Sequence, residues 1–270
     1  MSNSKTVIAF DLYGTLLSTE SIAKELAKYL PFEEKAQFIA TIWRRYQLEY
    51  TFRMNSMSVY APFEAVTTHA LRQALSEHHH DISIPDMAKI MSAYNALSTF
   101  PDVEAGLLAL AQDPDIDAYV FSNGSEAMVS ASVTESPSLS VHAGVFKELI
   151  TVQEVKCYKP DPRVYRYLLR KVGKAGKAAK NGDAGDVWLV SGNPFDIVGA
   201  RACGLKTCWV ARKDGDSGSG IWHDRMGEMA SGGPHIIVDG VDEAVRRIQR
   251  LSKNITSLDA EAPAFVSRQS

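Results

Sequence analysis

Short, continuous apolar runs recur along the chain, each bounded by polar or helix-forming sequence. They span residues 7–11, 118–122, 187–191, 207–210 and 236–239. Runs of this length without polar alternation are typical of strands buried on both faces of a parallel sheet, because helices cover each face of such a sheet. The pattern therefore predicts an α/β fold with a parallel-sheet core.

A long stretch between the first and second runs, at about residues 18–99, has almost no strand signal. Its apolar residues recur at roughly helical spacing, as in Ile22, Leu26 and Leu30, then Ile42, Leu48 and Met54. A connection of this length is too long for a simple crossover between parallel strands. The pattern predicts a helical cap domain inserted after the first strand.

The same pattern predicts how the chain is divided. We expect an α/β core from residues 1–17 and 100–252, a cap from residues 18–99, and a flexible tail from residues 253–270, where periodicity fades. Two segments rich in glycine, residues 173–185 and 213–234, predict irregular loops.

Composition and charge narrow the range of partners. The chain has 270 residues and a formal net charge of -3, without the basic stripe that nucleic-acid binding needs. No apolar stretch reaches the roughly 20 residues of a membrane-spanning helix, and the N-terminal residues do not resemble a secretory signal. The cysteines, Cys157, Cys203 and Cys208, lack metal or redox spacing, so we expect them to be reduced. A cytoplasmic protein acting on small molecules, without nucleic-acid or membrane partners, is expected.

Polar residues that can carry chemistry gather in short segments at or just past predicted strand ends. These are residues 11–16, 122–124, 159–161 and 191–196. Ligands of α/β sheets bind beyond the carboxyl ends of the strands, so the segments predict an active site. Asp11, at the end of a buried strand, can be held rigid and partly desolvated, as a carboxylate nucleophile requires. Taken alone, it is equally consistent with a turn or capping residue.

Together and in this order, the segments resemble those of the haloacid dehalogenase superfamily, over residues 7–238. The resemblance implies a Rossmann-like parallel-sheet core of that type with an inserted cap. It also implies a nucleophile at Asp11, an anion-binding hydroxyl at Ser122, a lysine at Lys159 and a carboxylate at Asp196. On this assignment Lys159 keeps Asp11 ionised through its opposite charge.

Tyr13 and Asn193 distinguish this chain from most of that superfamily. Its magnesium-dependent phosphatases have a second aspartate two residues after the nucleophile and an acidic pair in the last segment. A hard cation needs such carboxylate oxygens, and Tyr13 and Asn193 replace them here. We therefore expect no metal and no cofactor. The same residues match the L-2-haloacid dehalogenase branch.

Two longer stretches add to that match. Trp43-Arg44-Arg45-Tyr46-Gln47-Leu48-Glu49-Tyr50 is similar to the branch's Trp-Arg-x-x-Gln-Leu-Glu-Tyr, whose arginine contacts the departing halide. Residues 159–165 are similar to its Lys-Pro-Asp-x-Arg-Val-Tyr, which implicates Tyr165. Arg45 stands where the branch often has glutamine, a departure that bears on substrate range.

The resemblance assigns site roles residue by residue. Catalytic roles are implied for Asp11, Thr15, Lys159, Ser191, Asn193 and Asp196. Substrate contacts are implied for Tyr13, Arg44, Leu48, Phe63, Ser122, Asn123, Tyr165 and Phe195. Ordinary alternatives stay open: helix caps for Ser122 and Asn123, solvated charges for Arg44 and Lys159, and core packing for the aromatic residues. The consecutive histidines 78–80 are interpreted as a polar loop, because neighbours in sequence do not converge on one ion.

The activity implied is hydrolytic dehalogenation of short (S)-2-haloacids to (R)-2-hydroxy acids. It would proceed through an aspartyl ester on Asp11, with Asp196 activating water in the second step. A homodimer is one implied assembly. The alternatives are a related hydrolase acting on fluoroacetate or azetidine-2-carboxylate, a magnesium-dependent phosphatase, and a catalytically silent binding module.

Overall fold

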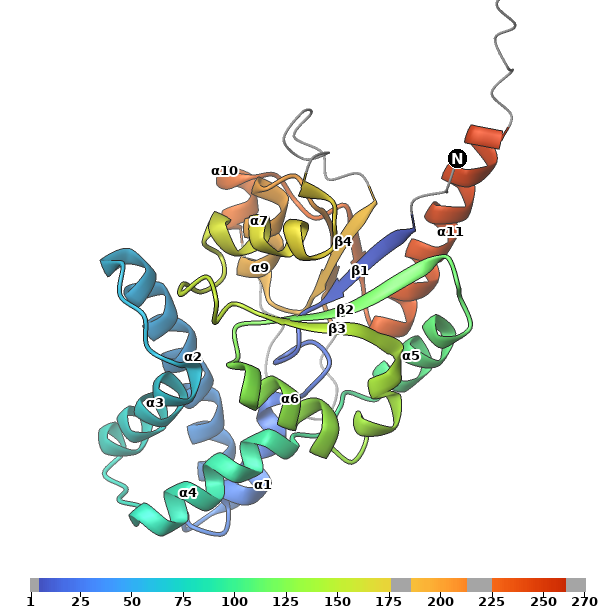
Figure 1. Ribbon diagram of the computed structural model, residues 1–270. Coiled ribbons are helices and arrows are strands. Elements are labelled where there is room, and N and C mark those ends of the chain that lie inside the picture. The colour runs from blue at the N-terminus through green and yellow to red at the C-terminus, as the bar shows by residue number, and fades with distance from the viewer. Residues whose placement is uncertain (1–4, 176–185, 213–224, 261–270) are drawn as a thin grey trace, which may run out of the picture.

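The core of the protein is a six-stranded parallel sheet (Figure 1). The computed structural model describes residues 5–175, 186–212 and 225–260. The strands are β1 (Thr6–Phe10), β2 (Ile116–Ser122), β3 (Phe146–Thr151), β4 (Val187–Ser191), β5 (Lys206–Val210) and β6 (Ile236–Val238), in the order β3-β2-β1-β4-β5-β6. The predicted α/β class is confirmed, and each apolar run of the sequence forms a strand.

The three central strands bring the predicted site segments to one edge of the sheet. β1 is buried along its whole length and lies between β2 and β4, so that Ala9 is opposite both Tyr119 and Leu189. Because these strands are parallel, their carboxyl ends meet at the same edge. Asp11 follows β1, and β2 and β4 end at Ser122 and Ser191.

Helices cover both faces of the sheet. They are α5 (Val103–Ala111), α6 (Glu126–Glu135), η3 (Ser140–Val145), α7 (Pro162–Lys171), α9 (Pro194–Ala202), α10 (Met226–Ala230) and α11 (Val241–Ala260). α5 and α11 pack together on one face, while α7 and α9 lie on the other (Figure 1). α7 begins where Asp161 accepts a hydrogen bond from the backbone N–H of Arg163 (2.8 Å) and Pro162 takes the first helical position.

The segment between β1 and α5 is helical and lies beside one end of the sheet (Figure 1). This cap contains η1 (Thr19–Ile22), α1 (Ala23–Leu26), α2 (Glu33–Met57), α3 (Phe63–Glu77), α4 (Ile84–Ala93) and η2 (Tyr94–Ala96). An isolated antiparallel bridge joins Leu17 to Thr99, and Ser18 N–H donates to the carbonyl of Ser98 (2.8 Å). The chain therefore leaves the core and returns to it at neighbouring positions.

β3 was not predicted from the sequence, and its place in the sheet explains why. It is an edge strand. Phe146 and Ile150 are buried, and its other residues, including Lys147 and Glu148, are exposed or half-buried. An edge strand does not need the continuous apolar run that marks a strand buried on both faces.

The C-terminal boundary and one loop also differ from expectation. α11 continues to Ala260, into the segment 253–270 expected to be a flexible tail. No glycine or proline stands between Val241 and Ala260, so nothing in the sequence interrupts the helix. α10 forms inside the expected loop 213–234. Residues 176–185, 213–224 and 261–270 lie outside the described residues.

Within the described ranges, no helix combines the length and the apolar character needed to cross a membrane. Cys157, Cys203 and Cys208 form no disulfide, as expected.

Candidate active site

Asp11 lies at the centre of a set of hydrogen-bond donors. Its Oδ2 accepts from the hydroxyl of Thr15 (2.7 Å) and from Nδ2 of Asn193 (2.7 Å), and its Oδ1 accepts from Nζ of Lys159 (3.0 Å). Only 6% of the residue is exposed. The carboxylate is therefore held in one orientation from three sides and largely shielded from water.

Lys159 joins two carboxylates that come from different loops. Its Nζ donates to Asp11, to Oδ2 of Asp196 (2.7 Å) and to the carbonyl of Phe121 (2.7 Å). Burial on its own lowers the pKa of the Lys159 ammonium, but Asp11 and Asp196 outweigh burial, so that pKa is raised above its ordinary value. Lys159 thus remains a cation inside the protein.

Asp196 is fully buried in the first turn of α9, where a second partner holds it. The hydroxyl of Tyr165 donates to its Oδ1 (2.7 Å). Burial raises the pKa of Asp196, and the opposing influence of Lys159 and Tyr165 does not cancel that effect. Burial and the Asp196 charge raise the pKa of Tyr165 well above its ordinary value, so the phenol stays protonated and serves as a donor.

Ser122, Asn123 and Ser191 shape the loops around Asp11 and Lys159. Ser122 and Ser191 each accept a hydrogen bond from the backbone N–H two residues later, at 3.1 Å in both cases. Asn123 accepts one from the backbone N–H of Lys159 (2.9 Å). These contacts fix the backbone at the carboxyl ends of β2 and β4.

Gly192 is required by the close approach of two of these loops. A Cβ at this position would lie 2.4 Å from the carbonyl oxygen of Gly14, far inside van der Waals contact. The Gly192 N–H donates to the hydroxyl of Thr15 (2.9 Å), which itself donates to Asp11. The last loop therefore helps to orient the nucleophile loop.

Arg44 reaches from the cap to the core. From α2, its Nη2 donates to the carbonyl of Tyr13 (3.1 Å) and to Oδ1 of Asn193 (3.2 Å). Its Nη1 donates to Oε1 of Gln47 (2.6 Å), whose own amide donates to the hydroxyl of Thr67 (2.8 Å). A guanidinium thus stands next to the residue that hydrogen-bonds Asp11.

The predicted aromatic and apolar contacts divide into two places. Tyr13 stacks on Phe63 with ring centroids 6.1 Å apart, and its hydroxyl is 2.9 Å from that of Ser132. Phe195 instead packs edge-on against Phe52 of α2, at 5.1 Å. Leu48 is buried within α2. Phe63 therefore adjoins the nucleophile loop, whereas Phe195 joins α9 to the cap.

Gln47 belongs to the motif matched in the sequence, but no role in the site was assigned to it. It is fully buried and links Arg44 to Thr67. Its position three residues after Arg44 on a helix was the available signal, because residues at that spacing share a face.

The donors around Asp11 do not fit a magnesium site. The partners that the structure gives its carboxylate are a hydroxyl, an amide N–H and an ammonium, and each of them donates. A divalent cation needs oxygen acceptors at these positions. Among the described residues, no group of histidine, cysteine and carboxylate side chains is arranged to hold a metal ion. The consecutive histidines 78–80 therefore form no such group either.

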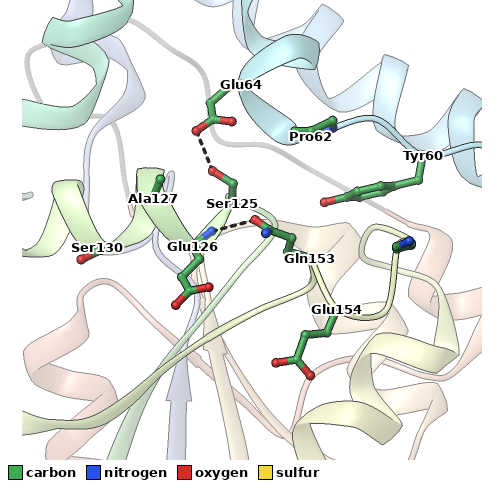
Figure 2. Close-up of a pocket in the computed structure, with 10 residues that line it drawn as sticks. Tyr60, Pro62, Glu64, Ser125, Glu126, Ala127, Ser130, Gln153 and Glu154 are labelled. Carbon is green, nitrogen blue, oxygen red and sulfur yellow. Dashed lines mark hydrogen bonds between the residues drawn. The ribbon is translucent and has the colours of Figure 1, made fainter.

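A wide groove of about 830 Å³ opens nearby between the cap and the core, but no predicted site residue lines it. Figure 2 shows Tyr60, Pro62 and Glu64 on the cap side, facing α6 and Gln153 of the core. The hydroxyl of Ser125 donates to Glu64 (2.9 Å) across the boundary. Three glutamates, Glu64, Glu126 and Glu154, and one lysine, Lys156, line the groove. It is therefore less suited to an anionic substrate than the surroundings of Arg44 and Lys159 are.

Comparison with known proteins gives a consistent picture. The family model for haloacid dehalogenase-like hydrolases matches residues 5–204. The (S)-2-haloacid dehalogenase of Pseudomonas sp. (strain YL) is 33% identical over 208 residues, covering 76% of this chain and 82% of that protein. Haloacetate dehalogenase H-2 of Moraxella sp. (strain B) is 32% identical over 205 residues, covering 76% and 85%. The solved structure of L-2-haloacid dehalogenase from Xanthobacter autotrophicus superposes with a TM-score of 0.77 at 25% identity, covering 91% of this chain and 99% of that one.

Proposed function

The chain belongs to the haloacid dehalogenase-like hydrolases, in the (S)-2-haloacid dehalogenase branch, and from this membership we propose that it converts short (S)-2-haloacids into (R)-2-hydroxy acids. The observation that carries the proposal is the Asp11 carboxylate, buried and oriented by Thr15, Asn193 and Lys159. Such a carboxylate is a competent nucleophile without a metal.

In the first step, an Asp11 oxygen attacks the 2-carbon from the face opposite the halogen. A carbon–oxygen bond forms, the carbon–halogen bond breaks and the halide leaves with the bonding electrons, so the carbon is inverted. Arg44 stabilises the charge that develops on the halide. Holding the two reactants in line can lower the barrier by roughly 7 to 11 kcal/mol.

In the second step, water attacks the carbonyl carbon of the Asp11 ester and transfers a proton to Asp196. The bond between Cγ of Asp11 and the substrate oxygen then breaks, and the departing alkoxide takes the proton back from Asp196, which releases the 2-hydroxy acid. Asp11 retains a solvent-derived oxygen and loses the remaining proton to solvent. Because no bond to the 2-carbon is made or broken in this step, its inverted configuration is retained. A placed general base contributes a factor of about 10² to 10⁴. Lys159, in contact with both carboxylates, stays charged throughout.

Substrate binding follows from the groups that surround Asp11. We assign the substrate carboxylate to the hydroxyl of Ser122, at the carboxyl end of β2. The short carbon chain of the substrate would be surrounded by Tyr13, Leu48, Phe63, Asn123 and Phe195. The relation to a haloacetate dehalogenase makes haloacetates, fluoroacetate included, the next substrates to test.

We propose the cap as residues 18–99 and the core as residues 1–17 and 100–252. The antiparallel bridge between Leu17 and Thr99 supports both boundaries, because it pairs the residues that flank the helical segment.

The test is halide release from each enantiomer of 2-chloropropionate in the presence of chelator. Chloride should appear from the (S) enantiomer only, and Asp11→Asn should abolish it. No chloride from either enantiomer, together with magnesium-dependent phosphate release from a generic phosphate ester, would overturn the proposal. In heavy-oxygen water under single-turnover conditions, the label should enter Asp11 and not the first product molecule.

A further inference from the structure

Tyr158, the residue before Lys159, belongs to the core chain but is buried in the cap. Its ring is fully buried, with its centroid 5.3 Å from that of Tyr60 and 6.0 Å from that of Phe63. Its hydroxyl donates to the backbone carbonyl of Ala61. The cap therefore surrounds the side chain next to Lys159.

Asn55 holds the backbone of the same residue from the cap. Near the end of α2, its Nδ2 donates to the carbonyl of Tyr158 (2.6 Å), and its Oδ1 accepts from the Tyr158 N–H (2.9 Å). Both backbone polar groups of Tyr158 are thus paired with one amide. Such two-point pairing fixes orientation as well as distance, because neither bond can form alone in the same geometry.

The next residue is held from the core. The backbone N–H of Lys159 donates to Oδ1 of Asn123, at the end of β2. Tyr158 and Lys159 are consecutive, so one peptide segment is fixed by one asparagine from the cap and one from the core. The Lys159 side chain then extends to Asp11 and Asp196.

We propose that Asn55 is a positioning residue for Lys159, which makes the ion-paired arrangement of the site depend on the cap being closed. This inference rests on the proposed function, because it takes Lys159 as the cation that maintains the nucleophile. A cap that moved away would break both Asn55 bonds and withdraw the pocket around Tyr158. Lys159 would then lose one of the two supports of its backbone, and its distance to the carboxylates would no longer be fixed.

The chain offers a matched control for a merely structural tether. Glu64 on α3 accepts a hydrogen bond from Ser125 on the core, so it also joins cap to core (Figure 2). No hydrogen bond that the structure shows links Glu64 to the backbone of Tyr158 or Lys159. Glu64→Ala therefore removes a cap–core contact and leaves the support of Lys159 in place.

The experiment compares Asn55→Leu, Asn55→Asp and Glu64→Ala with the full-length wild type. Asn55→Leu keeps the volume and loses both bonds, whereas Asn55→Asp keeps an acceptor for the Tyr158 N–H and loses the donor. For Asn55→Leu we expect kcat to fall about 10- to 100-fold with KM nearly unchanged, since a displacement of about 1 Å can cost 10²-fold. The acid limb of the kcat profile should move to higher pH, because a more distant Lys159 ammonium lowers the pKa of Asp196 less. Asn55→Asp should lie between Asn55→Leu and wild type.

A second readout does not require catalysis. The heteronuclear NMR signal of the Lys159 ammonium, assigned by its loss in Lys159→Met, should shift or broaden in Asn55→Leu and stay unchanged in Glu64→Ala. Equal losses of kcat in Asn55→Leu and Glu64→Ala, with an unmoved acid limb and an unmoved lysine signal, would overturn the role of Asn55. Absence of halide release from the wild type would instead overturn the proposed function and leave the NMR comparison decisive for the inference.

Discussion

Lys159 is the residue whose surroundings are most constrained. It is 1% exposed and contacts two carboxylates, so the buried group has a net negative charge when all three residues are ionised. A buried charge is tolerated only when it is paired and hydrogen-bonded, because burial in a low-dielectric interior is costly. The three side chains therefore act as a unit, and changing one alters the ionisation of the others.

Lys159→Met tests this dependence. Removing the cation leaves two buried carboxylates facing each other, so we expect unfolding to become easier by about 3–5 kcal/mol, the usual cost of breaking a buried pair. Halide release should be lost. Lys171→Met is the control, because Lys171 pairs with Glu148 at the surface and such pairs contribute roughly 0–1 kcal/mol. Similar denaturant midpoints for the two variants would contradict the prediction.

Tyr165→Phe tests the ionisation of Asp196. Asp196 must be ionised to accept a proton, and burial has raised its pKa, so the rate of ester hydrolysis should rise with pH through a value above that of an ordinary carboxyl. The Tyr165 hydrogen bond favours the ionised form. Its removal raises the pKa of Asp196 further and should move the acid limb to higher pH. Single-turnover kinetics across pH measure the limb, and an unmoved or lowered limb would refute the prediction.

At the scale of residues, the sequence indicates the residues that react but not the residues that hold them in position. Asp11 and Lys159 stand in motifs next to strand ends, where position along the chain already predicts a site. Asn55 hydrogen-bonds the backbone of Tyr158, which lies 103 residues further along the chain. An asparagine near a helix end has no local feature that predicts such a partner. Contacts of this kind depend on how two folded units meet.

At the scale of elements, Arg212 after β5 connects several segments near the base of the cap. It donates to both oxygens of Asp102 (2.8 and 2.7 Å) and to the carbonyl of Thr15 (2.9 Å). Its guanidinium lies 3.7 Å from the centre of the Phe100 ring. Asp102 also accepts from the N–H of Val241, at the start of α11 (2.7 Å). The start of α5, the start of α11 and the nucleophile loop are therefore fixed together.

Asp102→Asn tests that connection through the pH dependence of stability. Burial alone raises the pKa of Asp102, but the hydrogen bonds and charge of Arg212 outweigh it, so the pKa lies below its ordinary value. A depressed carboxyl pKa stabilises the folded state above the pKa of the unfolded chain, and that stabilisation is lost as pH falls through the folded value. Relative to wild type, the variant should be less stable by about 1–3 kcal/mol near neutral pH. Urea titrations should show the difference shrinking below about pH 4, and a difference independent of pH would contradict the assignment.

Elements differ in how far the sequence predicts them. Strands such as β1 and β4 are buried on both faces, so their continuous apolar composition alone predicts them as strands. β3 has one open edge, and its alternating burial resembles that of many exposed segments. The weakening apolar pattern predicts that the last helix ends near residue 252, whereas α11 continues to Ala260. A regular helix can continue where its apolar pattern weakens, provided that no residue stops it.

At the scale of the whole molecule, polar contacts near the site join the cap to the core. Arg44 bonds the nucleophile loop and Asn193, Asn55 bonds Tyr158, and Glu64 bonds Ser125. The positive charge of Arg44 therefore reaches the site only when the cap is in place. The sequence predicts the existence of the cap from its helical spacing, but not these contacts.

Assembly is a separate prediction for the whole molecule. The sequence resemblance described above implies a homodimer, so we predict that light scattering at micromolar concentration gives the mass of two chains. The mass should stay constant on moderate dilution, because an established dimer interface is usually large and apolar. The mass of a single chain at every concentration would contradict the prediction.

The bridge between Leu17 and Thr99 has a consequence for the history of such a chain. A segment whose two ends already touch can be removed, replaced or acquired by recombination without separating the strands around it. The helical segment can therefore be inherited independently of the core that supplies the nucleophile. A cap acquired in this way would also have to supply the contacts to the core that Arg44 and Asn55 make here.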